Sequence, residues 1–167
     1  TKTLAYGSVY GTLPTPTRDY YTFDGWSTDS SWTTSITELD ASVYEDTTLY
    51  AKWTPVTYHV VYHDVDEDYT SYTTFTVLSA TMDVPDPARE GFTFNGWSTG
   101  TDTSATDTTM SSLSIAQGSH DDRDYLARWR EHTYTIHFVS NTDGDVFASG
   151  TDMADVTTSY TNKFELP

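Results

Sequence analysis

Two short acidic segments carry the residue types that could bind a metal ion. Clustered carboxylate and amide oxygens are the ligands that Ca²⁺ prefers, and alternate side chains of an extended segment point the same way. Neither segment continues into the glycine and terminal glutamate of an EF-hand loop, so a solvated acidic turn is the simpler interpretation and a weak calcium site is the alternative. The alternating residues are Asp64, Asp66 and Asp68 in the first segment and Asn141, Asp143 and Asp145 in the second.

The remaining polar residues show no pattern typical of catalysis or of a cofactor site. The His residues are scattered and Cys is absent, so neither a zinc site nor thiol chemistry is predicted. Residues 119–122 (Ser-His-Asp-Asp) have the residue types of a catalytic triad, but they lack the motif that exposes a nucleophilic Ser. We therefore expect a protein that is not an enzyme and has no cofactor.

The charge of the chain excludes two classes of partner. Eight Lys and Arg residues against 25 Asp and Glu residues give a formal net charge of −17. Nucleic-acid phosphates and anionic membrane surfaces would both repel such a chain. No apolar run is long enough to span a bilayer. We expect no nucleic-acid binding and no membrane insertion in this segment.

One short pattern organises the chain, because residues 91–99 (Gly-Phe-Thr-Phe-Asn-Gly-Trp-Ser-Thr) repeat residues 20–28 (Tyr-Tyr-Thr-Phe-Asp-Gly-Trp-Ser-Thr). Aromatic and Thr residues alternate in each copy, which indicates a half-buried strand. The Asn-Gly or Asp-Gly dipeptide suits a two-residue hairpin turn. Since a Trp follows directly, a bulge that turns this Trp toward a core is an equal alternative.

Matching residues flank the pattern, so the repeat is long. Trp53 and Trp129 are 76 positions apart, whereas Trp26 and Trp97 are 71 apart, so the second copy carries five additional residues. We place them in a surface loop over 100–109. The recurring structural residues are Pro14, Pro16, Gly25, Trp26 and Trp53 in the first copy and Pro85, Pro87, Gly96, Trp97 and Trp129 in the second.

The repeat divides the chain into three units. Residues 1–54 form the back part of a first unit without its opening strand, 55–130 a complete unit, and 131–167 the front part of a third. The predicted fold class is mainly β with short helical turns (α+β), the helices lying over 36–44 and 110–116. The chain begins inside a unit, which suggests a segment of a longer protein.

The recurring Trp residues have two interpretations. They could form a platform on which sugars stack, or they could pack in the core of each unit. Recurrence in both copies favours core packing, since every copy must keep the residues that define its fold. Trp32 has no Trp counterpart in the second unit and follows a polar run, so it is the candidate for a surface contact.

These motifs resemble the Listeria–Bacteroides repeat, also called the internalin B-repeat family. The resemblance rests on the Pro-x-Pro segments, the Gly-Trp pairs and the closing strands at 49–53 and 125–129. It implies small β-grasp (ubiquitin-like) domains arranged in tandem, as beads on a string, on secreted or wall-attached microbial proteins. Such repeats are spacers or adhesive modules and are not enzymes. The pair Asp19-Tyr20 departs from the acidic-Gly pair that is usual at this point of the repeat.

The expected function is therefore that of a spacer, stalk or adhesin module at a microbial cell surface or cell wall. One alternative is the subunit of a pilus-like fibre, in which open strand edges of incomplete units pair head-to-tail between chains. A second alternative is a module that binds carbohydrate or a host protein through exposed Tyr residues and Trp32. The partners expected in all cases include adjacent repeats of the same protein.

Overall fold

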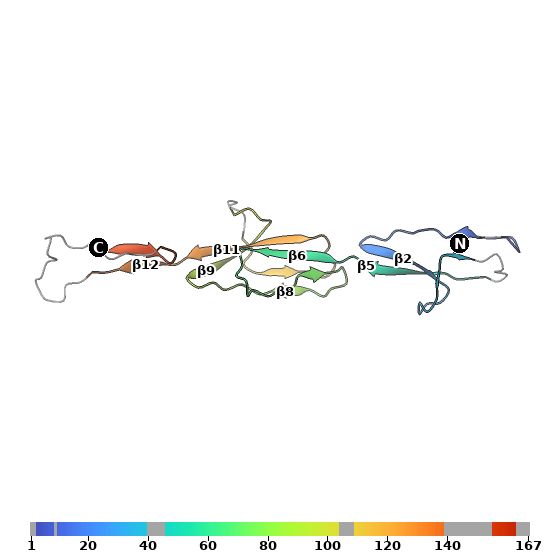
Figure 1. The fold of residues 1–167 in the computed structure, drawn as a ribbon, viewed down its shortest axis with the longest axis horizontal. Coiled ribbons are helices and arrows are strands. Elements are labelled where there is room, and N and C mark those ends of the chain that lie inside the picture. The colour runs from blue at the N-terminus through green and yellow to red at the C-terminus, as the bar shows by residue number, and fades with distance from the viewer. Residues whose placement is uncertain (1–2, 9, 40–45, 104–108, 139–154, 163–167) are drawn as a thin grey trace, which may run out of the picture. The chain divides into compact units, whose positions relative to one another are not determined.

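The computed structural model describes residues 3–8, 10–39, 46–103, 109–138 and 155–162 (Figure 1). This part of the chain contains strands and no helix, so the predicted mainly β class is confirmed. The strands are β1 (Gly11–Thr12), β2 (Tyr21–Ser27), β3 (Ser35–Ile36), β4 (Glu38–Leu39), β5 (Tyr50–Pro55), β6 (Tyr58–His63), β7 (Thr74–Phe75), β8 (Met82–Val84), β9 (Phe92–Thr99), β10 (Leu113–Ile115), β11 (Arg123–Glu131), β12 (Thr133–Ile136) and β13 (Val156–Ser159).

The helix predicted over 110–116 is wrong, because Leu113–Ile115 forms β10 and pairs antiparallel with β8. Leu113 and Ile115 are buried while Ser114 between them is exposed, which is the period of a strand. The helix predicted over 36–44 is also wrong where it can be compared, since β3 and β4 occupy 35–39. Residues 40–44 lie outside the described residues. Frequent Ser and Thr disfavour a helix in both segments.

The chain forms two compact units. The first comprises Thr1–His59, Thr74–Thr81 and Ala116–Asp122, and the second comprises Val60–Thr73, Met82–Ile115 and Arg123–Pro167. The predicted complete repeat, 55–130, is divided between the two units, and the second unit contains the larger part of it. The repeat boundaries after residues 54 and 130 stay predictions.

In the first compact unit, β2 is the central strand of a three-stranded sheet in the order β3-β2-β5. β2 is antiparallel to both neighbours, and its pairing with β5 runs from Tyr21 opposite Pro55 to Ser27 opposite Tyr50. β1 and β4 form a separate antiparallel pair. Leu13, which directly follows β1, is buried.

A mixed four-stranded sheet has the order β7-β6-β11-β9. β6 pairs with β7 through its first two residues and runs parallel to β11 through its last four, while β11 is antiparallel to β9. In the second compact unit, β8 pairs with β10 and β12 with β13. The buried apolar side chains of that unit are Val60, Val84, Trp97, Leu113, Ile115, Tyr125, Leu126 and Ala127.

Candidate functional site

The Gly-Trp motif forms a bulge within a continuous strand, so the bulge alternative is confirmed and the hairpin turn is wrong. In β2, Phe23 faces Trp53 and Gly25 faces Lys52, which leaves Asp24 as the extra residue. β9 repeats this geometry, with Asn95 as the extra residue opposite β11. Gly25 and Gly96 have φ angles of 132° and 112°, which side chains rarely adopt. The bulge therefore requires its glycine.

The two Trp residues that follow these bulges differ in burial. Trp97 has no exposed surface, and its indole Nε1 has no hydrogen-bond partner among the described residues. Its ring contacts those of Tyr62, Tyr69 and Phe94, at centroid distances of 5.4, 6.0 and 5.4 Å. Trp26 is only half-buried. The same local motif thus yields a core residue in one copy and a partly exposed one in the other.

The carbonyl of the first Pro in each Pro-x-Pro segment accepts a hydrogen bond in both copies, but from different donors. In the first copy the indole of Trp26 donates to the Pro14 carbonyl oxygen at 2.8 Å. In the second copy the Tyr69 hydroxyl donates to the Pro85 carbonyl oxygen at 2.7 Å. Tyr69 follows β6, and no counterpart of β6 precedes Pro14 in this sequence. Tyr69 thus replaces the indole at this carbonyl, and Trp97 packs inside.

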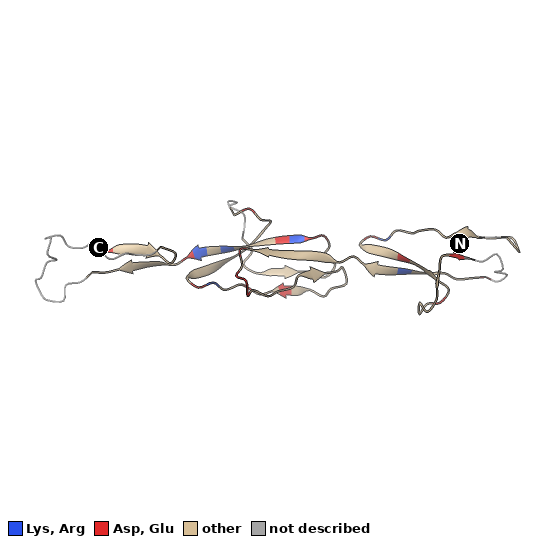
Figure 2. Ribbon diagram, viewed as in Figure 1, with Lys and Arg blue, Asp and Glu red and all other residues tan. Residues whose placement is uncertain are grey.

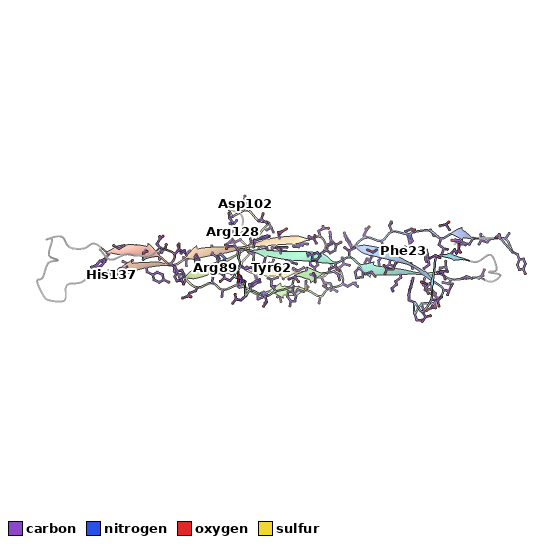
Figure 3. All side chains as sticks on the ribbon, in the orientation of Figure 1. Phe23, Tyr62, Arg89, Asp102, Arg128 and His137 are labelled. Atoms are coloured by element: carbon purple, nitrogen blue, oxygen red, sulfur yellow. The ribbon has the colours of Figure 1, made fainter. Side chains whose placement is uncertain are left out.

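The acidic turn at 64–68 holds Arg89, which directly follows the second Pro-x-Pro segment. The guanidinium donates from Nε to Asp66 Oδ1 at 2.7 Å, from Nη1 to Asp64 Oδ1 at 3.0 Å and from Nη2 to the Asp64 carbonyl at 2.8 Å (Figure 3). The indole of Trp129 donates to the same carbonyl at 2.9 Å, and the guanidinium lies 4.5 Å from the Trp129 ring centroid. Burial lowers the pKa of Arg89, but the bonds to Asp66 and Asp64 outweigh burial and raise it.

Arg89 therefore binds the carboxylates of Asp64 and Asp66, which were two of the candidate calcium ligands. Among the described residues, no group of three or more His, Asp or Glu side chains is arranged to hold a metal ion. Asp68 is exposed, and calcium binding in this turn stays a prediction. The second candidate segment, with Asn141, Asp143 and Asp145, lies outside the described residues.

The loop that carries Trp32 is organised by the carboxylate of Asp29. This carboxylate accepts hydrogen bonds from the Ser31 hydroxyl at 2.7 Å, from the Thr33 amide at 3.1 Å and from the Thr33 hydroxyl at 2.8 Å. The bond from Ser31 and those from Thr33 hold the pKa of Asp29 well below its usual range. Trp32 has a φ of 62° and is half-buried, with the Lys52 ammonium 5.6 Å from its ring centroid. Hydrogen bonds thus hold the loop that carries Trp32, the residue predicted to make a surface contact.

The basic residue of the closing strand has different contacts in the two copies. Arg128 aligns with Lys52, and its guanidinium donates to the Ser98 hydroxyl at 2.9 Å, to the Thr103 carbonyl at 2.8 Å and to the Asp102 carbonyl at 3.1 Å (Figure 3). Lys52, in contrast, lies beside an aromatic ring. Figure 2 shows basic residues along β11, which carries Arg123, Arg128 and Arg130.

The two joints between predicted repeats share one backbone arrangement. After β5, the Val56 amide donates to the Tyr20 carbonyl at 2.9 Å, and after β11, the His132 amide donates to the Gly91 carbonyl at 2.8 Å. Tyr20 and Gly91 have φ angles of 67° and 78°. The departure at Asp19-Tyr20 therefore leaves the turn unchanged, although a non-glycine residue at such a φ costs about 1–2 kcal/mol.

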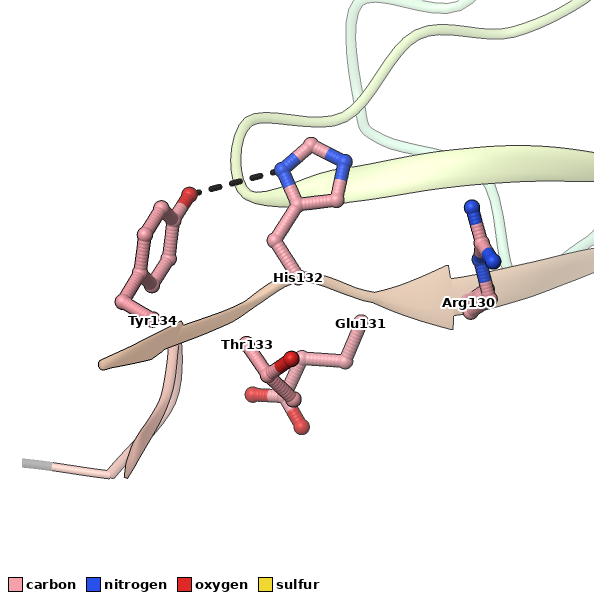
Figure 4. A pocket seen from close by; sticks show the side chains of 5 residues that line it. All are labelled: Arg130, Glu131, His132, Thr133 and Tyr134. Atoms are coloured by element: carbon pink, nitrogen blue, oxygen red, sulfur yellow. Dashed lines mark hydrogen bonds between the residues drawn. The ribbon is translucent and has the colours of Figure 1, made fainter. Parts of the chain in front are cut away.

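The second joint carries additional contacts. The Glu131 carboxylate accepts bonds from the Thr161 hydroxyl and amide, which lower the pKa of Glu131. A surface pocket of about 520 Å³ lies at this joint. Figure 4 shows the side chains that line it, which are Arg130, Glu131, His132, Thr133 and Tyr134. Its His132 is hydrogen-bonded to Tyr134 at 3.4 Å and, through Nε2, to Thr93 at 2.8 Å.

The histidines do not assemble a metal site in the described part of the chain. His59 and His63 have the four-residue spacing that joins two ligands on a helix, but both lie in β6. Four residues of strand span about 13 Å, which is too far for one metal ion. His63 Nε2 instead lies 2.8 Å from Asp124 Oδ1.

Sequence reasoning gave no role to Arg89, Tyr69 or Asp29. A signal existed for Arg89, because Arg18 stands at the matching position of the first copy. For Asp29, the surrounding Ser and Thr residues indicate a loop that bonds a carboxylate. Nothing local indicates the bond between Tyr69 and Pro85, since 16 positions separate them.

Comparison with protein families decides the classification. The model of the Listeria-Bacteroides repeat domain matches residues 1–52 and 58–119, which is more than half of the chain. The chain belongs to this family. The predicted resemblance is confirmed, and the Listeria–Bacteroides repeat is a non-enzymatic repeat domain typical of bacterial surface proteins.

A relative of these Listeria–Bacteroides repeats is a protein of Evansella cellulosilytica named "Putative Gly-rich membrane protein". It is 26% identical over 141 residues, which are 81% of this chain and 15% of the relative. The chain thus spans less than a sixth of the relative's length. No solved structure matches the chain. The described residues include no helix long and apolar enough to cross a bilayer.

Proposed function

We propose that this chain is a non-catalytic spacer segment of an extracellular bacterial surface protein, in which ordered joints connect successive repeats. The observation that carries the proposal is the shared hydrogen bond from the Val56 amide to Tyr20 and from the His132 amide to Gly91. Each bond extends the ladder of the closing strand by one residue, to the residue that leads into the next repeat.

The connecting segments are too short to act as flexible linkers. Only Val56 and Thr57 separate β5 from β6, and only His132 separates β11 from β12. Flexible linkers are Gly- and Ser-rich and longer, so that many backbone conformations are accessible. A segment of one or two hydrogen-bonded residues transmits the direction of one strand to the next, which is the property that a spacer needs.

Three further features support this role. The first and last strands of the predicted complete repeat, β6 and β11, lie side by side and parallel in a mixed sheet. The net charge of −17 keeps an exposed segment soluble and discourages association between chains. Membership of a family typical of bacterial surface proteins supports a location at the cell surface.

Spin-label distance measurements across the second joint test the proposal. Because the chain has no Cys, labels attach specifically to Thr99→Cys and Thr157→Cys, whose positions are exposed. We expect a narrow distance distribution, and a broad one after insertion of four Gly and Ser residues between Glu131 and His132. A native distribution as broad as that of the insertion variant would contradict an ordered joint.

A second candidate function, contact with a carbohydrate or a host protein, is favoured by the geometry of Trp32. The hydrogen bonds of Asp29 fix the loop, and Trp32 adopts a positive φ that has a cost of about 1–3 kcal/mol. Such strain is typical of residues that a protein holds in place for binding. The Lys52 ammonium beside the ring favours an acidic sugar over a neutral one.

An oligosaccharide array with matched neutral and carboxylated sugars tests this second candidate. Binding that Trp32→Ala abolishes and Tyr6→Ala retains would support it, because Tyr6 is an exposed aromatic in another part of the first compact unit. Absence of binding to the whole array, or equal binding by both variants, would remove a carbohydrate site at Trp32.

A further inference from the structure

We propose that the complete repeat contains a mechanical clamp that resists force applied along the chain. The clamp is the parallel pair, defined as Val60–His63 of β6 with Arg123–Leu126 of β11, paired in register from Val60 opposite Arg123 to His63 opposite Leu126 (Figure 1). The proposal rests on the spacer role, because a spacer at a cell surface transmits force between what it connects.

The direction of the load follows from the strand order. The chain enters the repeat at the amino end of β6 and leaves it at the carboxyl end of β11. Since the two strands are parallel, tension at these points pulls them along their axes in opposite directions. The hydrogen bonds between the strands lie across this direction, so they are loaded together and must break together. Tension on an antiparallel hairpin held at its open end breaks its bonds one after another.

Side chains reinforce the parallel pair within the second compact unit. His63 Nε2 lies 2.8 Å from Asp124 Oδ1, which joins the two strands directly. The rings of Tyr62 and Tyr125 are stacked with their centroids 6.2 Å apart. Because Val60, Tyr125 and Leu126 are all buried, water cannot readily replace the bonds between these strands.

Further hydrogen bonds hold the carboxyl end of the parallel pair. The Trp129 indole in β11 donates to the Asp64 carbonyl directly after β6, at 2.9 Å. Arg89 bonds the same carbonyl and the carboxylates of Asp64 and Asp66, so the end of β6 is held from two directions. Sliding of β6 against β11 therefore also breaks these bonds. The acidic turn thereby gains a role that needs no metal ion.

Single-molecule force spectroscopy on the whole chain tests the clamp by changing only the points of attachment. Thr57→Cys with Thr133→Cys loads the parallel pair in shear, whereas Glu67→Cys with Thr133→Cys pulls both strands from the same end. All three positions are exposed, and the chain has no other Cys. At one loading rate, we expect a rupture force at least about twofold higher in shear, since forced unfolding follows the unfolding barrier. Equal forces, or a lower force in shear, would overturn the proposal.

A matched pair of variants tests whether the parallel pair itself carries the load. Val60→Ala removes two methyl groups within the pair, and Val84→Ala removes the same groups from β8, outside it. The two Val side chains are 4% and 6% exposed, so the substitutions create similar losses of packing. We expect Val60→Ala to lower the shear rupture force more than Val84→Ala, and both to affect the other geometry equally. Equal reductions in shear would overturn the assignment of the load to this pair.

The clamp proposal and the spacer proposal can be contradicted separately. An ordered joint with a weak parallel pair would give a narrow spin-label distribution and equal rupture forces, which would leave the spacer and remove the clamp. A flexible joint with a strong pair would give a broad distribution and a high shear force.

Discussion

The two copies of the Gly-Trp strand have nearly the same sequence and the same bulge, yet they differ in what surrounds the Trp. Trp97 is completely buried against Tyr62 and Tyr69, which β6 and the segment after it supply. Trp26 remains half-buried and donates its indole N–H to the Pro14 carbonyl. The local motif therefore determines the backbone, whereas the burial of the Trp depends on the side chains that other segments place around it.

The Arg residues of the two copies extend the comparison. Arg18 and Arg89 occupy equivalent turns. The Tyr21 amide donates to the Arg18 carbonyl and the Phe92 amide donates to the Arg89 carbonyl, both at 3.2 Å. Arg18 lies over the Tyr21 ring at 3.8 Å, whereas Arg89 bonds the acidic turn that follows β6. In the second copy, β6 and the segment after it thus supply both the aromatic side chains around Trp97 and the acidic partners of Arg89.

The largest difference is expected for removal of the two Trp side chains. Trp97→Ala leaves a cavity in the core and should lower the free energy of unfolding by about 3–5 kcal/mol. Trp26→Ala should cost about 1–2 kcal/mol, because its ring buries less apolar surface. Urea unfolding, with hydrogen exchange to assign each transition to β9 or β2, measures both. Equal losses would contradict the difference in burial between the two Trp side chains.

The next largest difference is expected for the bulge glycines. A Cβ at Gly96 would lie 2.6 Å from the Met110 carbonyl oxygen, whereas a Cβ at Gly25 would contact nothing within 4 Å. Both substitutions to Ala also strain a positive φ, at a cost of about 1–3 kcal/mol. Gly96→Ala should therefore destabilise at the top of that range or above, and Gly25→Ala near its bottom. The same urea titration measures both losses of stability. A larger loss for Gly25→Ala than for Gly96→Ala would contradict the close packing around Gly96.

A smaller difference is expected for the two Arg residues. Arg89→Ala removes charge-assisted bonds to Asp64 and Asp66, which are 46% and 42% exposed, so solvent screening limits the loss to about 1–2 kcal/mol. Arg18→Ala should change stability by less than about 0.5 kcal/mol. Thermal unfolding at low and high salt separates the two, because the salt dependence should differ from that of the native chain more in the Arg89 variant than in the Arg18 variant. Equal salt dependence of both variants would contradict this difference.

The smallest effect is expected for the Asp29 loop, which the second copy replaces with Gly100 at the aligned position. Hydrogen bonds hold the native pKa of Asp29 below its unfolded value of about 3.9. A group with a depressed native pKa stabilises the folded loop above the unfolded pKa, and this contribution is lost as the pH falls. Trp fluorescence should change in acid for the native chain, while Asp29→Asn should already show the acid value at neutral pH. An unchanged neutral spectrum in Asp29→Asn would reject this role.

Strand positions could be predicted from the sequence where one face is buried. The alternation of Phe92, Thr93 and Phe94 identified β9, and the Trp directly after Asn-Gly raised the bulge as an alternative to a turn. The same alternation of Leu113 and Ile115 was present in the sequence, but a helix was expected there instead. Short amphipathic segments are ambiguous between the two periods, and pairing with β8 decides the outcome.

The candidate site was less predictable, because its bonds join distant segments. Asp64 and Asp66 were recognised as clustered oxygens, but their partner Arg89 lies more than twenty positions away. Trp32 was recognised as a residue without a counterpart, while the positive φ that fixes it depends on the carboxylate of Asp29. Local patterns identify such residues and leave their partners undetermined.

The joints are the feature that both copies share despite their different cores. Hydrogen exchange of the native chain, resolved to the Val56 and His132 amides, tests most directly whether the repeats form an ordered spacer. The account predicts that both amides exchange as slowly as those of the flanking strands, since each donates to a backbone carbonyl. Exchange of both amides at the rate of an unprotected linker would contradict it.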